Sequence, residues 1–189
     1  IVAAMELAKS GSQPRAAAFI DADTDKAIAL LADWADTDYL AADGIDAANG
    51  SDLAKSSAAT AIFNSFLPFL LQNLAGDEGG LGVNRLGNSM VGRFLWRLFV
   101  HPETMASYDS EAGTHPAWDD TSTNDVVETR EEIIAKSLRQ AVDFLKATDK
   151  VGPAQAGGFG TADMDQWRWG QLHTVTLRHN VTPAYNIPS

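Results

Sequence analysis

The sequence predicts a mainly α-helical protein with a small β component. Two patterns in the chain point to this fold class. Apolar residues recur at the helical period of 3.6 in several segments, whereas one late segment alternates between polar and apolar residues as a strand does. The 189 residues contain no internal repeat, and 45% of them are hydrophobic, a fraction typical of globular proteins that argues against global disorder.

Three helical segments are expected in the first half of the chain. Residues 1–9 have the pattern of the tail of a helix that begins upstream. Asp23 or Thr24 is expected to cap the next helix, in which four apolar residues share one face: Ala27, Leu30, Leu31 and Trp34. The third helix runs from Leu53 to Leu74, and Pro68 should kink or divide it because proline lacks an N–H and clashes with the preceding turn.

Connectors separate these helices from a short helix in the middle of the chain. Residues 36–52 form an acidic connector that is rich in Ala and Gly and has few large apolar side chains, and residues 76–87 have the composition of a loop. Asn88 or Ser89 is expected to begin the short helix, which stops near His101-Pro102 because proline disfavours a helical residue before it.

The clearest helix is predicted from Arg130 to Ala147. Thr129 and Glu132 have the spacing of a capping box, in which each side chain binds the backbone N–H of the other residue. Residues 172–177 then alternate as a strand does, and residues 183–188 are expected to be extended. A single strand needs a partner sheet, so either its partners lie elsewhere or it pairs weakly.

Composition excludes several classes of partner. The net charge of −11 and the pI of about 4.6 leave no basic surface that could displace counterions from phosphates, which argues against a nucleic-acid partner. No apolar run approaches the roughly 20 residues that a membrane-spanning helix needs, which argues against a membrane partner. The absence of cysteine excludes disulfides and thiolate chemistry, and no signal peptide is visible at the start of the chain.

No metal site and no cofactor are predicted. Residues 21–25 imitate the opening of a calcium loop, but Lys26 replaces the glycine of its sharp turn and Ala32 replaces its closing glutamate. A solvated helix N-terminus, where the macrodipole favours acidic residues, is the preferred interpretation. The four histidines have no recognisable spacing of metal ligands.

The chain contains no complete catalytic constellation. It has no nucleophile elbow, no Walker loop and no dinucleotide-binding glycine motif. Asp119 and Asp120 could act as an acid/base pair, but we favour loop carboxylates that accept backbone hydrogen bonds or pair with arginine.

Positions 167–179 combine two tryptophans, a glycine and two histidines in one short block. Its sequence is Trp-Arg-Trp-Gly-Gln-Leu-His-Thr-Val-Thr-Leu-Arg-His. Trp167, Trp169, Gly170 and His173 stand at fixed offsets within it. The structural interpretation of His173 is a partly buried ring that hydrogen-bonds and fixes the packing of the adjacent tryptophans. The block closely resembles the Trp-x-Trp-Gly-x-x-His signature near the end of the penicillin amidase family.

Other segments resemble the same family in the correct order. Residues 29–34 and 57–63 are similar to the leucine-tryptophan helix and the small-residue helix of its large subunit. Trp118-Asp119-Asp120 and residues 128–134 resemble its aromatic-Asp-Asp loop and Glu-Thr-Arg helix, and residues 185–188 resemble the stretch after the signature. The resemblance implies a structural role, and no catalytic role, for six residues: Trp167, Trp169, Gly170, His173, Asp119 and Asp120.

The resemblance also implies a fold, an activity and partners. Members are bacterial N-terminal nucleophile hydrolases with an αββα fold, in which a serine exposed by self-cleavage attacks an amide and its own α-amino group serves as base. Their substrates include β-lactam antibiotics, the acyl-homoserine lactones of quorum sensing and lipopeptides, and they are usually periplasmic or secreted. Because Ile1 stands at the first position, the nucleophile and oxyanion asparagine are expected outside this chain.

On this interpretation residues 1–189 are a single fragment of a larger acylase domain. Residues 1–150 would form a helical region and residues 151–189 a segment with the return strand. The partners would be the small subunit, the N-terminal part of the large subunit and a small amide substrate. Two alternatives stay open, a self-contained helical binding module and a structural subunit that needs partner chains to fold. Sequence upstream of Ile1 distinguishes them, because only an acylase requires a processing serine there.

Overall fold

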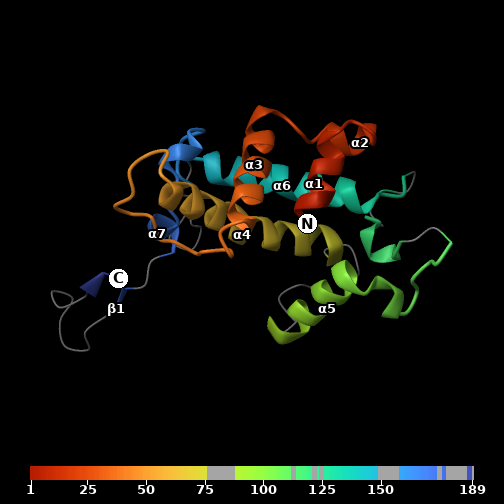
Figure 1. Ribbon diagram of the computed structural model, residues 1–189. Coiled ribbons are helices and arrows are strands. Elements are labelled where there is room, and N and C mark those ends of the chain that lie inside the picture. The colour runs from red at the N-terminus through yellow and green to blue at the C-terminus, as the bar shows by residue number, and fades with distance from the viewer. Residues whose placement is uncertain are drawn as a thin grey trace. The chain divides into compact units, whose positions relative to one another are not determined.

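The computed structural model describes residues 1–75, 88–111, 114–120, 123, 126–148, 158–173, 176–177 and 187–188. The described part is mainly helical, as the sequence predicts (Figure 1). Its contacts divide the chain into two compact units. The first unit comprises residues 1–28 and 65–142, and the second comprises residues 29–64 and 143–189. Loops expected at 76–87 and after residue 148 lie outside the described residues.

The first unit is built from helices whose buried faces are rich in alanine and branched aliphatic residues. Its elements include α1 (Val2–Lys9), α2 (Pro14–Ala17), α5 (Asn88–Val100), the 3-10 helices η2 (Pro102–Thr104) and η3 (Pro116–Trp118), and most of α6 (Arg130–Lys146). Ala8, Ala16 and Ala135 are buried together, with Phe19 and Ile20 packed against them. Small side chains at these positions allow the helices to approach closely.

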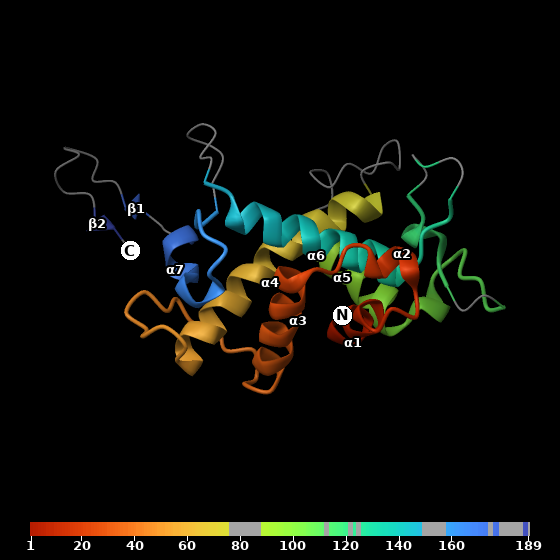
Figure 2. The ribbon, with the colours of Figure 1, turned by 90° about the horizontal axis from the view of Figure 1, so that it is seen from above.

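α6 makes the strongest polar contacts of the first unit. Its cap forms in one direction only, because the Glu132 backbone N–H donates to Thr129 Oγ1 at 3.3 Å while the Glu132 carboxylate accepts from Arg15 Nε at 3.0 Å. The reciprocal half of the predicted capping box is therefore replaced by an ion pair with α2. Along the same helix, Asn73 of α4 (Asp52–Ala75) donates to Ser137 Oγ at 2.8 Å, and the two helices lie side by side there (Figure 2).

α3 (Ala22–Ala35) begins two or three residues earlier than the predicted caps require. Asp21 is the capping residue, since its Oδ1 accepts from the backbone N–H groups of Asp23 at 3.1 Å and Thr24 at 2.9 Å. The Thr24 hydroxyl in turn accepts from the Asp21 N–H at 2.6 Å. The prediction of Asp23 or Thr24 was wrong because both lie inside the first turn. Thr24 supplies the return bond of a capping box.

The apolar face predicted for α3 is confirmed. Ala27, Leu30, Leu31 and Trp34 are all buried. Within the second unit, Trp34 stacks against Phe63 at 5.6 Å and donates its indole N–H to the Leu40 carbonyl at 2.9 Å. A buried indole therefore has its polar group satisfied by the connector that follows the helix.

α4 (Asp52–Ala75) is a single helix that continues through Pro68, so of the two expected effects, a kink or a division, the division does not occur. Pro68 lies on the exposed side of the helix. At that position the missing N–H leaves the carbonyl one turn earlier accessible to water, and the buried stripe of Ile62, Phe66, Leu70 and Leu74 continues without interruption.

The predicted strand at 172–177 is only partly present. Leu172 is the last residue of a short helix, α7 (Trp169–Leu172), and the strand β1 comprises Thr176–Leu177. β1 pairs antiparallel with β2 (Ile187–Pro188), with Thr176 opposite Pro188 and Leu177 opposite Ile187. Alternation alone mispredicted the start of the strand because Leu172 belongs to the turn of α7, which the His173 N–H closes by donating to the Trp169 carbonyl at 2.9 Å.

Replacement of Asp21 tests the cap of α3. Asp21→Ala should lower the free energy of unfolding by about 1–2 kcal/mol, because two N–H groups lose their acceptor and Arg139 loses its ion pair. Asp21→Asn keeps an acceptor oxygen and should lose less than half as much. Urea denaturation followed by circular dichroism measures both. Equal losses for the two variants would show that the cap contributes little.

Candidate functional site

The signature residues 167–173 all lie in the second unit, around the 3-10 helix η4 (Met164–Gln166) and α7. Trp167 is fully buried and donates its indole N–H to the Thr161 carbonyl at 2.9 Å. Its ring stacks on Phe159 with centroids 5.4 Å apart. Since the Phe159 N–H donates to the Leu145 carbonyl at 2.6 Å, Trp167 fixes the chain against the end of α6.

Ser57 connects the signature to the acidic connector. Its hydroxyl donates to the Asp43 carbonyl at 2.6 Å and accepts from the Trp169 N–H at 2.8 Å. The same Asp43 carbonyl accepts from the Gly170 N–H at 2.9 Å. Three segments far apart in the sequence, residues 43–45, the start of α4 and the start of α7, therefore meet at one serine. We call these contacts the Ser57 joint.

Arg168 occupies the unspecified position between the two tryptophans and is 4% exposed. Its guanidinium donates to the carbonyl oxygens of Asp165 at 2.8 Å, Trp167 at 3.0 Å and Ala47 at 3.0 Å, and to Asn49 Oδ1 at 2.6 Å. All four acceptors are neutral. A guanidinium always carries its charge, so these four charge-assisted bonds are what make its burial tolerable.

Two glycines allow the joint to close. Gly44 has a φ of +68°, and a Cβ atom there would collide with the Ser57 side chain. A Cβ atom on Gly170 would lie 2.7 Å from Ile45 Cδ1 and 3.0 Å from Asp43 Cβ. Both positions therefore require glycine for close approach, and at Gly44 also for backbone conformation.

His173 ends the described part of the signature. It is exposed, so the prediction of a partly buried ring was wrong. Its ring lies against Trp169 with centroids 5.0 Å apart, and its backbone N–H donates to the Trp169 carbonyl at 2.9 Å. His173 thus covers one of the two tryptophans. His179 lies outside the described residues.

Asp119 and Asp120 lie in the first unit, after η3. Asp119 Oδ1 accepts from the Glu128 N–H at 3.2 Å, and Asp120 Oδ2 pairs with Lys136 Nζ at 3.1 Å. Glu128 Oε2 accepts from the Asp120 N–H at 3.0 Å, which closes the loop before α6. These contacts are the loop contacts that we favoured from the sequence, except that the cation is a lysine and not an arginine.

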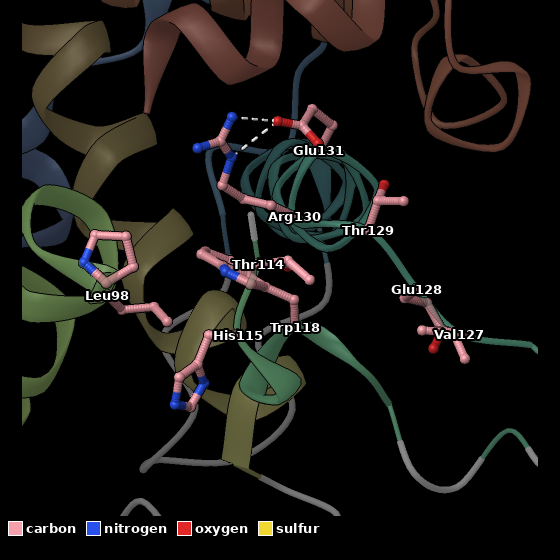
Figure 3. Close-up of a pocket in the computed structure, with 10 residues that line it drawn as sticks. Leu98, Thr114, His115, Trp118, Val127, Glu128, Thr129, Arg130 and Glu131 are labelled. Carbon is pink, nitrogen blue, oxygen red and sulfur yellow. Dashed lines mark hydrogen bonds and ion pairs between the residues drawn. The ribbon is translucent and has the colours of Figure 1, made fainter. Parts of the chain in front are cut away.

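A cavity of about 330 Å³ lies in the first unit, lined by Leu98, Pro102, Thr114, His115, Trp118 and residues 127–131 (Figure 3). His115 Nε2 lies 2.9 Å from the Ala106 carbonyl, and Nδ1 accepts from the Ala117 N–H at 3.0 Å. These two contacts hold the neutral Nε2–H tautomer. The Arg130 guanidinium turns away from the His115 ring and toward Glu131. Its Nε–H donates to Glu131 Oε1 at 2.8 Å.

Electrostatics in the first unit stabilise the fold. Glu132, by its hydrogen bonds, raises the pKa of the Arg15 guanidinium above its ordinary value. Asp25 does the same for the pKa of Lys9, with which it forms an ion pair. Both cations are at the surface, so these shifts mark contacts between helices and do not indicate a reactive group.

The described residues contain no group of three or more His, Cys, Asp or Glu side chains placed to hold a metal ion. Across the same part of the chain, no helix has the length and apolar character that crossing a membrane requires. The signature residues are brought together with Ser57, Asp43 and Arg168, but Asp119 and Asp120 belong to the other unit. What the signature does chemically is donate and accept structural hydrogen bonds.

Sequence reasoning missed Arg168 and the Asp43 carbonyl. Arg168 stood at an unspecified position of the signature, and a carbonyl acceptor has no side-chain pattern at all. The Asp43-Gly44 dipeptide was the available signal for a turn with positive φ. Ser57 belonged to the small-residue helix, where small size indicated close packing without naming the partner.

Comparison with known proteins identifies one family. The family model described as Penicillin amidase matches residues 2–188. No curated protein and no solved structure matches the chain.

Adjacent serines on α4 provide a matched test of the Ser57 joint. Ser57→Ala should lower the free energy of unfolding by about 1–3 kcal/mol, because the Trp169 N–H loses its acceptor in the interior. Ser56→Ala, one position earlier on the same helix and also buried, should change it by about 0.5 kcal/mol or less. Urea midpoints of the two variants decide the point. Equal urea midpoints for Ser57→Ala and Ser56→Ala would show that the joint contributes nothing to stability.

Proposed function

The chain belongs to the penicillin amidase family, and we propose that it forms the helical, C-terminal part of the large subunit of an acylase. The reaction is hydrolysis of an acyl amide by an N-terminal serine that lies outside residues 1–189. The observation that carries this proposal is the family match over residues 2–188.

The way the hydroxyl and imidazole groups are used supports a nucleophile from elsewhere. A serine nucleophile needs an adjacent base that can accept its proton. Ser57 Oγ is held between the Asp43 carbonyl and the Trp169 N–H, and Ser137 Oγ donates to the Ile133 carbonyl at 2.7 Å. Both nitrogens of His115 face backbone groups. None of these hydroxyl groups is paired with a base.

In the proposed enzyme this chain is scaffold. Six signature residues have structural roles: Trp167, Trp169, Gly170, His173, Asp119 and Asp120. The partners are the small subunit and the N-terminal part of the large subunit, and β1 returns to the αββα layers that they form. Residues 1–189 then constitute one fragment of a larger domain, with a helical region at 1–150. The substrate is a small-molecule amide such as a β-lactam side chain or an acyl-homoserine lactone, in a periplasmic or secreted enzyme.

The isolated 189-residue chain should have no acylase activity, because the serines described above are not paired with a base and the proposed nucleophile lies outside the chain. Purified chain, shown by circular dichroism to be helical, is incubated with a penicillin, an acyl-homoserine lactone and a chromogenic acyl anilide. The expected rate of amide cleavage equals that of buffer. Cleavage that follows the chain through purification would contradict the proposal.

A chimera supplies the positive arm of the test. The chain replaces the corresponding segment of an active penicillin amidase, and hydrolysis is measured after self-cleavage. We expect active enzyme, with Ser57→Ala lowering the yield of processed enzyme but leaving the kcat/KM of the processed fraction within about twofold. A large loss of kcat in fully processed enzyme would place Ser57 in the chemistry and contradict the scaffold role.

A further inference from the structure

The exposed face of α5 differs from an ordinary solvated helix face. Arg93, Trp96, Arg97 and Val100 stand at positions i, i+3, i+4 and i+7, so they form one stripe along the helix. Trp96 is 56% exposed and Val100 is 54% exposed, whereas Leu98 on the other side is 2% exposed. We call these four residues the α5 face. Tryptophan and arginine are the residue types most enriched at the energetic centres of protein interfaces.

The two arginines of the α5 face are unusual for this chain. The sequence holds 25 acidic residues against 14 lysines and arginines, so carboxylates are in excess. Arg15, Arg130 and Arg139 each pair with a carboxylate in the first unit. Within the described residues, neither Arg93 nor Arg97 forms a side-chain hydrogen bond or ion pair. The α5 face is therefore positive and partly apolar, with charge left to be matched.

A surface of complementary character lies in the second unit. A hollow of about 300 Å³ is lined by Leu30, Trp34, Thr37 and Ser56, with Asp33, Asp36, Asp52 and Lys55 as its charged members. We call it the acidic hollow. Asp33 and Asp36 are exposed and make no ion pair within the part of the chain described, and the Asp52 carboxylate is 3.8 Å from Lys55 and 99% exposed. Its two large apolar side chains, Leu30 and Trp34, are buried, whereas its carboxylates are exposed.

We propose that the α5 face of one molecule docks into the acidic hollow of a second copy of this chain. Trp96 enters the hollow over Leu30 and Trp34. Arg93 and Arg97 are four residues apart on α5, whereas Asp33 lies in the last turn of α3 and Asp36 directly follows that helix, with its N–H donating to the Asp33 carbonyl at 3.2 Å. Two cations and two carboxylates, each pair about one turn apart, can therefore face each other on either side of the tryptophan.

Charge favours a second copy over other acidic partners. A molecule of net charge −11 is repelled by an anionic membrane, by nucleic acid and by a second copy alike, so the partner must offer a local surface that fits the α5 face. A second copy carries the matched hollow itself. The contact joins two different surfaces, so a pair of molecules keeps one free α5 face and one free acidic hollow, and assembly continues to a ring or an open chain. This self-association is independent of the proposed acylase function, and its test uses no activity.

Sedimentation velocity measures the association. The 189-residue chain should show a weight-average mass that rises with concentration and falls as NaCl increases from about 0.05 M to about 0.5 M, because exposed charges are screened. Trp96→Ala should weaken association about 30-fold, as expected for the loss of a central interface tryptophan. A chain that stays monomeric at low salt and high concentration overturns the proposal.

Charge reversal in both surfaces identifies the contact. Arg93→Glu/Arg97→Glu and Asp33→Lys/Asp36→Lys should each be monomeric, because each places like charges opposite one another. An equimolar mixture of the two should associate again, since both of the contacts it allows are between opposite charges. Failure of the mixture to associate overturns the assignment of the two surfaces. Because the mixture gains association, loss of folding cannot imitate the expected result.

Matched controls separate geometry from net charge. Glu6→Lys/Asp46→Lys changes the net charge as much as Asp33→Lys/Asp36→Lys but lies outside the hollow, so it should associate like the natural chain. Arg93→Lys/Arg97→Lys should retain association within about threefold. Arginine-dependent binding to phosphatidylserine vesicles by a chain that does not self-associate would assign the α5 face to a membrane and overturn the proposal.

Discussion

The second unit depends on how the backbone of residues 36–51 satisfies its polar groups. This connector is neither helix nor strand, has few large apolar side chains and carries several aspartates. Backbone groups that leave water must find partners, and an irregular segment cannot supply them by a regular ladder. Ser57, Gly170 and Arg168 supply them from outside, at the carbonyls of Asp43 and Ala47. The connector is held by hydrogen bonds from these residues because its own apolar content is too small.

This constraint explains the composition of the signature. Trp167 is large because it anchors the chain against Phe159, and Gly170 is small because Asp43 and Ile45 lie where its side chain would be. Between the tryptophans, Arg168 reaches four acceptors with one planar group, which a lysine ammonium could not match in geometry. The large Trp167, the small Gly170 and the charged Arg168 thus each meet a different requirement of the same joint.

The sequence predicted what depends on local periodicity and failed where a distant residue decides. The buried face of α3 follows from spacing alone, and Ala27, Leu31 and Trp34 are buried as expected. The start of the strand predicted at 172–177 was wrong because Leu172 ends α7, a short helix whose first N–H donates to Ser57, 112 residues before Trp169. Glu132 failed as half of a capping box for the same reason, since Arg15 lies 117 residues away.

The predictions about the site likewise succeeded where the partners are close in sequence and failed where they are distant. The loop role of Asp119 and Asp120 was accessible because their partners, Glu128 and Lys136, are within the next 17 residues. The hydrogen-bond partner of Trp169 could not be predicted, because the sequence of a small-residue helix does not indicate which distant backbone N–H its serine accepts from. We inferred burial of His173 from its neighbours. In the structure this residue is exposed, and its ring covers only one of the two tryptophans, Trp169.

A signature whose polar groups form hydrogen bonds within the protein identifies a fold and not a reaction. The guanidinium of Arg168 is 4% exposed and faces only neutral acceptors, so it offers nothing to a substrate. Its value to an amide hydrolase is positional, because catalysis requires reacting groups held to within a fraction of an ångström by parts that take no share in the chemistry. A family can therefore be recognised by residues that hold its scaffold together, whatever part they take in its reaction.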